Sequence, residues 1–282
     1  MKASPVFSPM LRKSLFVASL AVTALSLANG VMAQTPDFKP SVGQAGKDVV
    51  WVPTSDVLVG KMLDMAKVTP ADYLMDLGSG DGRTVIAAAR RGVTAQGIEY
   101  NPDMVKLSQE NAAKAGVSDK ATFMKADIFQ TDFSKATVIT LFLLPDLNLR
   151  LRPTILNMKP GTRVVSNSFT MGDWEDDDTA TAGEGGDCSY WCIAHMWIVP
   201  AKVEGTWQFN GGKLTLKQKY QMVSGSLETG GQPASVGGKL RGDQITFKAG
   251  NAEYSGKVNG NAIEGTVKTG AQTSKWVATR AN

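Results

Sequence analysis

Carboxylates and glycines follow one apolar run in an arrangement that could hold a small charged molecule. The stretch "MDLGSGDGRT", residues 75–84, contains, in order, Asp76, Gly78, Ser79, Gly80, Asp81 and Gly82. The run before the glycines predicts a strand, and the run after them predicts a helix. Glycines at such a turn adopt unusual dihedrals and let a ligand approach the main chain. We therefore predict a small-molecule site at the carboxyl end of this strand.

The charges of this turn favour a cationic ligand over a dinucleotide. The dinucleotide fingerprint is G-x-G-x-x-G, but Arg83 stands where that pattern needs Gly or Ala. Asp76 and Asp81 would repel a pyrophosphate and attract an ammonium or sulfonium group. A nicotinamide-dependent oxidoreductase is thereby disfavoured.

Two further acids follow the next two predicted strands. Glu99 lies in "GIEYN" and Asp127 in "KADIF". With these residues in place, "DLGSGDG" resembles motif I of the class I S-adenosylmethionine-dependent methyltransferases. The resemblance implies that Glu99 binds the ribose hydroxyls and that Asp127 lies near the adenine. It extends the predicted cofactor site to Tyr100, Asn101 and Ile128, with S-adenosylmethionine as cofactor and no metal.

A narrower resemblance covers residues 50–200. Stretches such as "VWVPTSDVLVGKMLDMA" and "ATVITLFLLPDLNLRLRP" are similar to small protein-lysine methyltransferases. These are related to the mitochondrial enzymes that modify subunit c of ATP synthase and the adenine nucleotide carrier. The resemblance implies a protein-lysine acceptor, with a small molecule as the alternative. A third hypothesis is an exported, non-catalytic binding module that keeps the fold.

The resemblance also locates candidate acceptor-binding residues. "LLPDLN" lies where the family lines the methyl-transfer pocket, so Asp146 and Asn148 are the candidates to hydrogen-bond an amine there. A helix N-cap is an equal alternative for Asp146. Pro53 and Thr54 lie on the segment expected to cover the cofactor. Trp174 either borders the substrate channel or packs in the core.

Strand-like and helix-like patterns alternate between residues 51 and 201. Such alternation predicts an α/β domain: a Rossmann-like, mostly parallel sheet with helices on both faces. Residues 202–282 differ, because they form short alternating runs rich in Gly and Thr. The stretch "GKLRGDQI" (238–245) is repeated approximately as "GKVNGNAI" (256–263), with turn residues inside each copy. We predict about eight antiparallel strands that form a small barrel or meander.

The first 33 residues have the pattern of an export signal. Lys2, Arg12 and Lys13 precede an apolar run, and "VMA" ends it before Gln34. A cleaved leader predicts a periplasmic or secreted protein, whereas an uncleaved one predicts a membrane anchor and membrane contact. Residues 34–50 are predicted to be a linker. Without the three basic residues of the leader the net charge falls from +4 to about +1, so nucleic acid is not an expected partner.

The two cysteines, Cys188 and Cys192, lie in "CSYWC". On a straight strand their Cα atoms would be about 13 Å apart, too far for a disulfide. The sequence leaves open whether they are free thiols or form one local bridge across a turn. The spacing with one distant histidine, His195, is a poor zinc signature, and we expect that histidine to be structural.

Overall fold

The computed structural model describes residues 1–6, 38–183, 188–209 and 211–281. The chain divides into two units, Met1–Asp37 and Phe38–Asn282, and the helices and strands described below belong to the second. Most of the predicted leader lies outside the described residues. Across the described part of the chain, no helix has both the length and the apolar character needed to cross a membrane.

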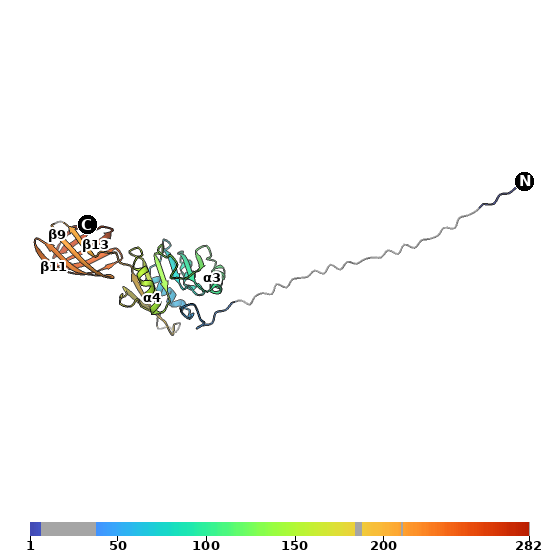
Figure 1. The fold of residues 1–282 in the computed structure, drawn as a ribbon, viewed down its shortest axis with the longest axis horizontal. Helices are drawn as coiled ribbons and strands as arrows, with labels where there is room; N and C mark the ends of the chain where they lie inside the picture. The colour runs from blue at the N-terminus through green and yellow to red at the C-terminus, as the bar shows by residue number, and fades with distance from the viewer. Residues whose placement is uncertain (7–37, 184–187, 210, 282) are drawn as a thin grey trace. The chain divides into compact units, whose positions relative to one another are not determined.

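A seven-stranded sheet forms the first part of the Phe38–Asn282 unit (Figure 1). Its spatial order is β3-β2-β1-β4-β5-β7-β6, with β7 antiparallel to both of its neighbours. The strands are β1 (Tyr73–Leu77), β2 (Thr94–Glu99), β3 (Ala121–Lys125), β4 (Val138–Leu141), β5 (Arg163–Asn167), β6 (Asp178–Thr181) and β7 (Ile193–Ile198). The helices are α1 (Asp56–Met65), α2 (Arg83–Arg90), α3 (Pro102–Lys114) and α4 (Pro145–Ile155). The predicted mostly parallel α/β sheet is confirmed.

Helices cover both faces of this sheet because its central strands are apolar on both sides. In β1, Leu74 joins a core with α1, α2 and α3, whereas Met75 and Leu77 join a second core with α4. Successive side chains of a strand point to opposite faces, so an uninterrupted apolar run needs cover on each. Local signals set the helix starts: Ser55 accepts the Leu58 N–H, and Asn101 caps α3.

Strand β6 was not predicted from the sequence. The stretch "EDDD" (175–178) reads as a solvated loop, yet its last residue begins β6. This strand lies at the sheet edge and pairs with β7 from Asp178 to Thr181. Exposed edge strands tolerate polar residues, so hydrophobic alternation does not reveal them.

Eight antiparallel strands close into a barrel after the sheet, and Figure 1 labels three of them, β9, β11 and β13. They are β8 (Gly205–Phe209), β9 (Gly212–Lys219), β10 (Met222–Thr229), β11 (Gln232–Arg241), β12 (Gln244–Ala249), β13 (Ala252–Asn259), β14 (Ala262–Thr269) and β15 (Gln272–Arg280). An eight-stranded barrel is just wide enough for side chains to fill it. Trp207, Phe247 and Trp276 belong to its buried core. The expected small β barrel is confirmed.

Two-residue turns join the strands from β9 to β15, and the first of these turns differs from the rest. Those from β10 to β15 begin with a glycine at positive φ, as Gly242 (φ 64°) and Gly260 (φ 59°) do in the repeated stretches. The β9–β10 turn instead begins with Tyr220 at φ 52°. Its ring stacks on Trp174, with centroids 5.9 Å apart, and its hydroxyl donates to Asp173 over 2.8 Å. At this turn a tyrosine therefore adopts a backbone conformation that favours glycine, and its side chain contacts the α/β part.

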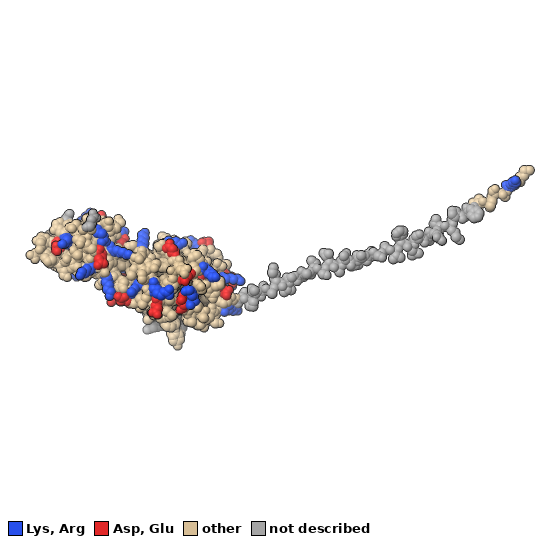
Figure 2. All heavy atoms as spheres, viewed as in Figure 1, with Lys and Arg blue, Asp and Glu red and all other residues tan. Residues whose placement is uncertain are grey.

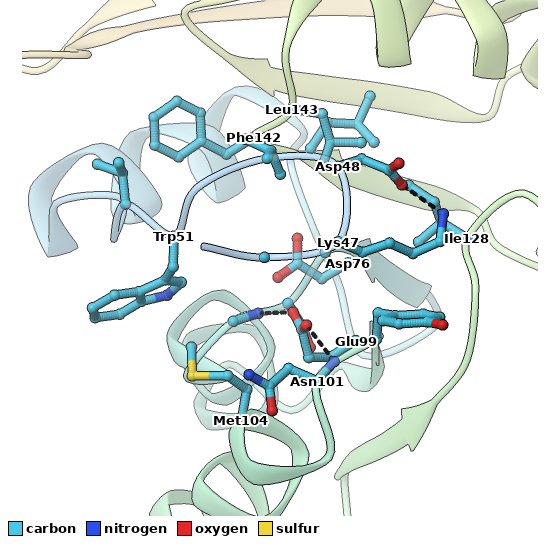
Figure 3. A pocket seen from close by; sticks show the side chains of 18 of the residues that line it. Lys47, Asp48, Trp51, Asp76, Glu99, Asn101, Met104, Ile128, Phe142 and Leu143 are labelled. Carbon is cyan, nitrogen blue, oxygen red and sulfur yellow. Dashed lines mark hydrogen bonds and ion pairs between the residues drawn. The ribbon is translucent and has the colours of Figure 1, made fainter. Parts of the chain in front are cut away.

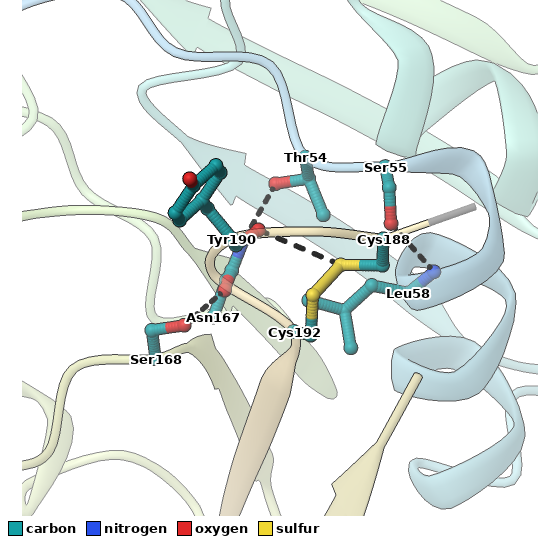
Figure 4. The surroundings of a disulfide bond; sticks show 8 residues. All are labelled: Thr54, Ser55, Leu58, Asn167, Ser168, Cys188, Tyr190 and Cys192. Carbon is teal, nitrogen blue, oxygen red and sulfur yellow. Dashed lines mark hydrogen bonds between the residues drawn. A yellow bond between two sulfur atoms is a disulfide. The ribbon is translucent and has the colours of Figure 1, made fainter. Parts of the chain in front are cut away.

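Cys188 and Cys192 form a disulfide, with their Cα atoms 5.8 Å apart (Figure 4). The chain bends over residues 189–191, which brings the two Cα atoms within reach of one bridge. Both cysteines pack against the core beside α1. Of the two alternatives that the sequence left open, the structure has the local bridge.

Candidate active site

One pocket lies at the carboxyl ends of the parallel strands, where the sequence predicted a small-molecule site (Figure 3). The strand order places Asp127, Glu99, the Gly78–Gly82 turn and Phe142 along one sheet edge, after β3, β2, β1 and β4 respectively. Open α/β sheets bind ligands at this edge. Of the predicted cofactor residues, the pocket is lined by Asp76, Gly78, Ser79, Gly80, Asp81, Glu99, Tyr100, Asn101, Asp127 and Ile128.

Gly82 is the predicted cofactor residue that does not line the pocket. It is the N-cap of α2 with φ 83°. A Cβ atom there would lie 2.7 Å from the Phe123 ring and 2.9 Å from Ser108. Its role in the structure is therefore close packing of the turn against α3 and β3.

Glu99 is held in place by two backbone donors. The Gly80 N–H donates to one carboxylate oxygen over 3.0 Å, and the Asn101 N–H donates to the other over 2.9 Å. Each carboxylate oxygen has a second lone pair that can accept a further hydrogen bond. The side chain is thus oriented in advance as an acceptor for two hydroxyl groups.

Asp76 is buried at the end of β1 and accepts a hydrogen bond of 2.6 Å from the Thr140 hydroxyl. Burial is the main cause that raises the pKa of Asp76 to about 7; the Thr140 hydrogen bond opposes this rise, and the nearby Glu99 and Asp81 carboxylates add to it. A cationic group placed beside Asp76 would favour its ionised form. The carboxyl group is therefore suited to receive an ammonium group.

Asp81 already forms an ion pair with Arg83, so the attraction of a cationic ligand, which the sequence analysis assigned to Asp76 and Asp81, cannot rest on Asp81. The Arg83 guanidinium contacts its carboxylate with Nη2–Oδ2 2.7 Å and Nε–Oδ1 3.0 Å. The same guanidinium donates to the Thr54 carbonyl over 2.9 Å. Asp76 and Glu99, rather than Asp81, therefore supply the unpaired negative charge at this turn.

Asp127 lies at the far end of the pocket, after β3. Its oxygens contact the Phe129 N–H at 2.9 Å and the Lys47 Nζ at 3.3 Å. The Phe129 hydrogen bond, with a contribution from Lys47, lowers the pKa of Asp127. The carboxylate is thus ionised and fixed where the resemblance places the adenine.

Residues 44–54 cover the pocket, although 34–50 were expected to be a linker. Backbone hydrogen bonds close a loop between residues 43 and 51: the Gly43 N–H donates to the Trp51 carbonyl, and the Trp51 N–H donates to the Gln44 carbonyl. A Cβ atom on Gly80 would lie 2.7 Å from the Trp51 indole nitrogen. Only glycine fits beneath this indole, so the loop and the turn are matched in shape. Pro53 and Thr54 line the pocket, as the resemblance implied.

The two predicted acceptor-binding residues are not at the pocket. Asp146 is exposed in the first turn of α4, whose N-cap is Leu144, so it is also not the cap. Asn148 is fully buried, and its amide donates to the Phe169 carbonyl over 3.2 Å. Because α4 begins at Pro145, Asp146 faces solvent and Asn148 faces the core, so the structure does not bring either residue to the pocket lining. Asn148 therefore fixes the segment after β5.

Trp174 packs rather than bordering a channel. It is fully buried between Trp197 and Tyr220. Asp173 beside it binds Arg152 over 2.7 Å, and the Tyr220 hydroxyl and Arg152 lower the pKa of Asp173 to about 2. His195 contacts Asp176 at 2.6 Å and does not line the pocket.

Sequence reasoning missed the aromatic residues at the β4–β5 end of the pocket. Phe142 and Phe169 follow these strands, and Trp191 reaches the pocket from the disulfide loop. An aromatic residue one position past a strand gives no signal of its own, because core packing explains it equally well. Lys47 was missed because residues 34–50 have the composition of a linker, and Trp51, which follows that stretch directly, was not singled out.

The residues present fit S-adenosylmethionine. Glu99 suits the ribose, Asp127 and Ile128 the adenine, and Asp76 the ammonium group. The buried Ser79 hydroxyl has no protein partner among the described residues, and so a polar atom is left for a ligand. When bound, this cofactor supplies a methyl group on a positively charged sulfur.

The fold and the site together define a class I S-adenosylmethionine-dependent methyltransferase. The family model for the ANTKMT methyltransferase domain matches residues 76–178. A protein-lysine N-methyltransferase of Saccharolobus islandicus is 39% identical over 140 residues, which cover 49% of this chain and 87% of that protein. The chain belongs to this methyltransferase family.

Two further proteins are similar to this chain. A mouse lysine N-methyltransferase that acts on the C subunit of ATP synthase is 38% identical over 40% of this chain, and the match spans 46% of the mouse enzyme. The crystal structure of an RNA methyltransferase from Salinibacter ruber, in complex with S-adenosyl-L-homocysteine, is 45% identical with a TM-score of 0.50. That match covers 54% of this chain and 96% of the other. The S-adenosyl-L-homocysteine bound in that structure supports S-adenosylmethionine as the cofactor.

Proposed function

We propose that this methyltransferase transfers the methyl group to the side-chain amine of a protein lysine. The observation that carries the proposal is the chemistry of the β4–β5 end of the pocket. Its described lining there is apolar and aromatic, including Phe142, Leu143 and Phe169, whereas the lining carboxylates belong to other segments. The lysine-specific relatives support the same acceptor.

An apolar wall suits an amine acceptor. Only the neutral amine has a lone pair to attack the methyl carbon, and burial in apolar surroundings lowers the pKa of an ammonium group. The nitrogen–carbon bond forms as the carbon–sulfur bond breaks, and the positive charge moves from sulfur to nitrogen, which then releases a proton. The enzyme's contribution is to position the two reactants and exclude water.

The alternative acceptors are a small molecule and, by analogy with the Salinibacter ruber RNA methyltransferase, RNA. The visible face in Figure 2 has basic and acidic side chains interspersed rather than a continuous basic surface. Proteins that bind the phosphate backbone normally present clustered Lys and Arg. The face shown in Figure 2 therefore favours protein over RNA.

The test is to follow methyl-labelled S-adenosylmethionine into a total extract. The purified chain is incubated with extract protein, RNA and metabolites, and the label is then identified after hydrolysis. The Glu99→Ala variant is the matched control. Label in methylated lysine that depends on Glu99 is the expected result. Label in RNA or in small molecules alone would overturn the lysine proposal.

We also propose that the protein is exported to an oxidising compartment. The leader pattern and the Cys188–Cys192 bridge support this, because structural disulfides persist outside the reducing cytosol. The test is the N-terminal sequence and the thiol content of protein isolated from its source cells. A start at Gln34 and no reactive thiol are expected. A start at Met1 together with two alkylated cysteines would overturn the proposal.

A further inference from the structure

An aromatic cluster lies at the β4–β5 end of the pocket, away from the predicted cofactor contacts. Phe142 and Phe169 are stacked with centroids 6.2 Å apart, and Trp191 lies 5.2 Å from Phe169 and 6.2 Å from Phe142. All three line the pocket, and Trp191 is 48% exposed. The cluster is thus open both to the pocket and to solvent.

The strand order separates this cluster from the adenine end. Asp127 and Glu99 follow β3 and β2, whereas Phe142 and Phe169 follow β4 and β5 on the other side of β1. The Gly78 turn lies between the two groups because β1 lies between β2 and β4. This turn packs against the β4 end of the pocket, since a Cβ atom on Gly78 would be 3.1 Å from Leu143. A molecule entering past Trp191 therefore reaches the middle of the pocket from the end that the acidic residues leave free.

Trp191 comes from the loop that the disulfide closes. Cys188 and Cys192 bracket this residue, and Trp191 has φ 59°, a left-handed conformation that costs a tryptophan energy. The loop is fixed where it leads into β7. Ala182 donates to the Cys192 carbonyl over 2.8 Å, and Ser168 donates to the Ile193 carbonyl over 2.7 Å. The bridge and these bonds hold the indole against Phe169.

We propose that Phe142, Phe169 and Trp191 form the subsite in which the acceptor's amine becomes positively charged, and that the Cys188–Cys192 bridge positions Trp191 in it. This inference rests on the proposed amine acceptor. Aromatic faces attract a cation within about 6 Å of the ring centroid. They also stabilise the positive charge that develops on the acceptor nitrogen. An acceptor whose product is uncharged would gain nothing from this subsite.

The test uses two soluble probes of the same shape, choline and its uncharged isostere 3,3-dimethylbutan-1-ol. Each is titrated into the full chain saturated with S-adenosyl-L-homocysteine, and binding is followed by NMR on the methyl protons of the probe. We expect saturable binding of choline, about fivefold or more tighter than that of the alcohol. Equal binding of the two probes would overturn the proposal.

Substitutions in the disulfide loop test whether the preference for choline comes from the aromatic cluster. Trp191→Leu is expected to remove the preference for choline, whereas Trp191→Phe keeps part of it. Tyr190→Leu is the matched control, because Tyr190 is on the same loop, 82% exposed and not part of the pocket lining. Loss of the preference in Tyr190→Leu equal to that in Trp191→Leu would contradict the assignment.

The bridge is tested with the Cys188→Ser/Cys192→Ser double variant. We expect weaker choline binding with unchanged calorimetric affinity for S-adenosyl-L-homocysteine. Unchanged choline binding would remove the positioning role of the bridge. Lysine labelling without a choline preference would overturn this inference alone, whereas label that never enters lysine would overturn the proposed function.

Discussion

The Glu99 carboxylate accepts the backbone N–H of Gly80 over 3.0 Å and thereby joins the end of β2 to the turn after β1. Gly80 in turn lies beneath the Trp51 indole, and its carbonyl accepts the Ser108 hydroxyl over 2.8 Å. Four segments far apart in the sequence thus meet at one glycine. The pocket is formed by this junction before any ligand binds.

Asp76 makes cofactor binding dependent on pH. Since the pKa of Asp76 is about 7 in the ligand-free protein, a bound ammonium group will draw a proton off the carboxyl. We expect affinity to rise from pH 6 to pH 8 and the proton release to disappear in Asp76→Asn. Calorimetric titration with S-adenosyl-L-homocysteine in two buffers of different ionisation enthalpy measures this. A flat affinity in the wild type would contradict it.

The same carboxyl affects stability in the opposite direction. A raised folded-state pKa means that the free energy of unfolding falls as pH rises from about 4 to about 7, by roughly 2–4 kcal/mol. Asp76→Asn is therefore expected to be more stable than the wild type above pH 7 when no ligand is present. Urea unfolding at pH 5 and pH 8 checks the sign.

Arg83 connects the glycine turn to the covering segment through Asp81 and the Thr54 carbonyl. Its removal should cost about 1–2 kcal/mol of stability, a modest value because the guanidinium is partly exposed. We expect Arg83→Ala to speed hydrogen exchange over residues 51–55 and to weaken cofactor binding. Arg83→Lys should restore little, since it lacks the forked geometry. Unchanged exchange in Arg83→Ala would show that the covering segment does not depend on this contact.

The positions of Asn148 and Asp146 predict that substituting the first lowers stability and that substituting the second changes it little. Asn148→Ala leaves the partly buried carbonyls of Phe169 and Thr170 without this donor and is expected to cost about 1–3 kcal/mol of stability. Asp146→Ala is expected to change stability by less than about 0.5 kcal/mol. Neither variant should abolish methyl transfer, which a labelled-cofactor assay measures. Full loss of turnover in a folded Asp146→Ala would reinstate it as an acceptor-binding residue.

Tyr220 joins the barrel to the α/β part at a cost in backbone strain. Tyr220→Gly relieves the positive φ but removes the stacking on Trp174 and the bond to Asp173. We expect the wild type to unfold in one calorimetric transition, and we expect that transition to broaden or split into two in Tyr220→Gly. Tyr220→Phe, which keeps the ring, should retain one transition. One sharp transition in Tyr220→Gly would mean that other contacts hold the two parts together.

Much of the α/β fold could be predicted because apolar strands, glycine turns and helix caps are local signals. The acids at successive strand ends were locatable for the same reason, since parallel strands end at one sheet edge. The partners of these residues could not be predicted, because contacts such as Lys47–Asp127 depend on tertiary packing. The positions of Asp146 and Asn148 could not be predicted for a related reason: a shift of one or two residues in a helix start changes which side chains face the pocket.

The cofactor site is tested most directly by the affinity of the full chain for S-adenosylmethionine in the wild type, Glu99→Ala and Glu99→Gln, measured by calorimetry. We expect micromolar binding by the wild type and a loss of about tenfold or more in Glu99→Ala, because a charged acceptor of two hydroxyls is removed. Glu99→Gln, which keeps one acceptor oxygen, should lie between them. Equal affinity in all three folded proteins, or none in the wild type, would contradict the assignment of this pocket.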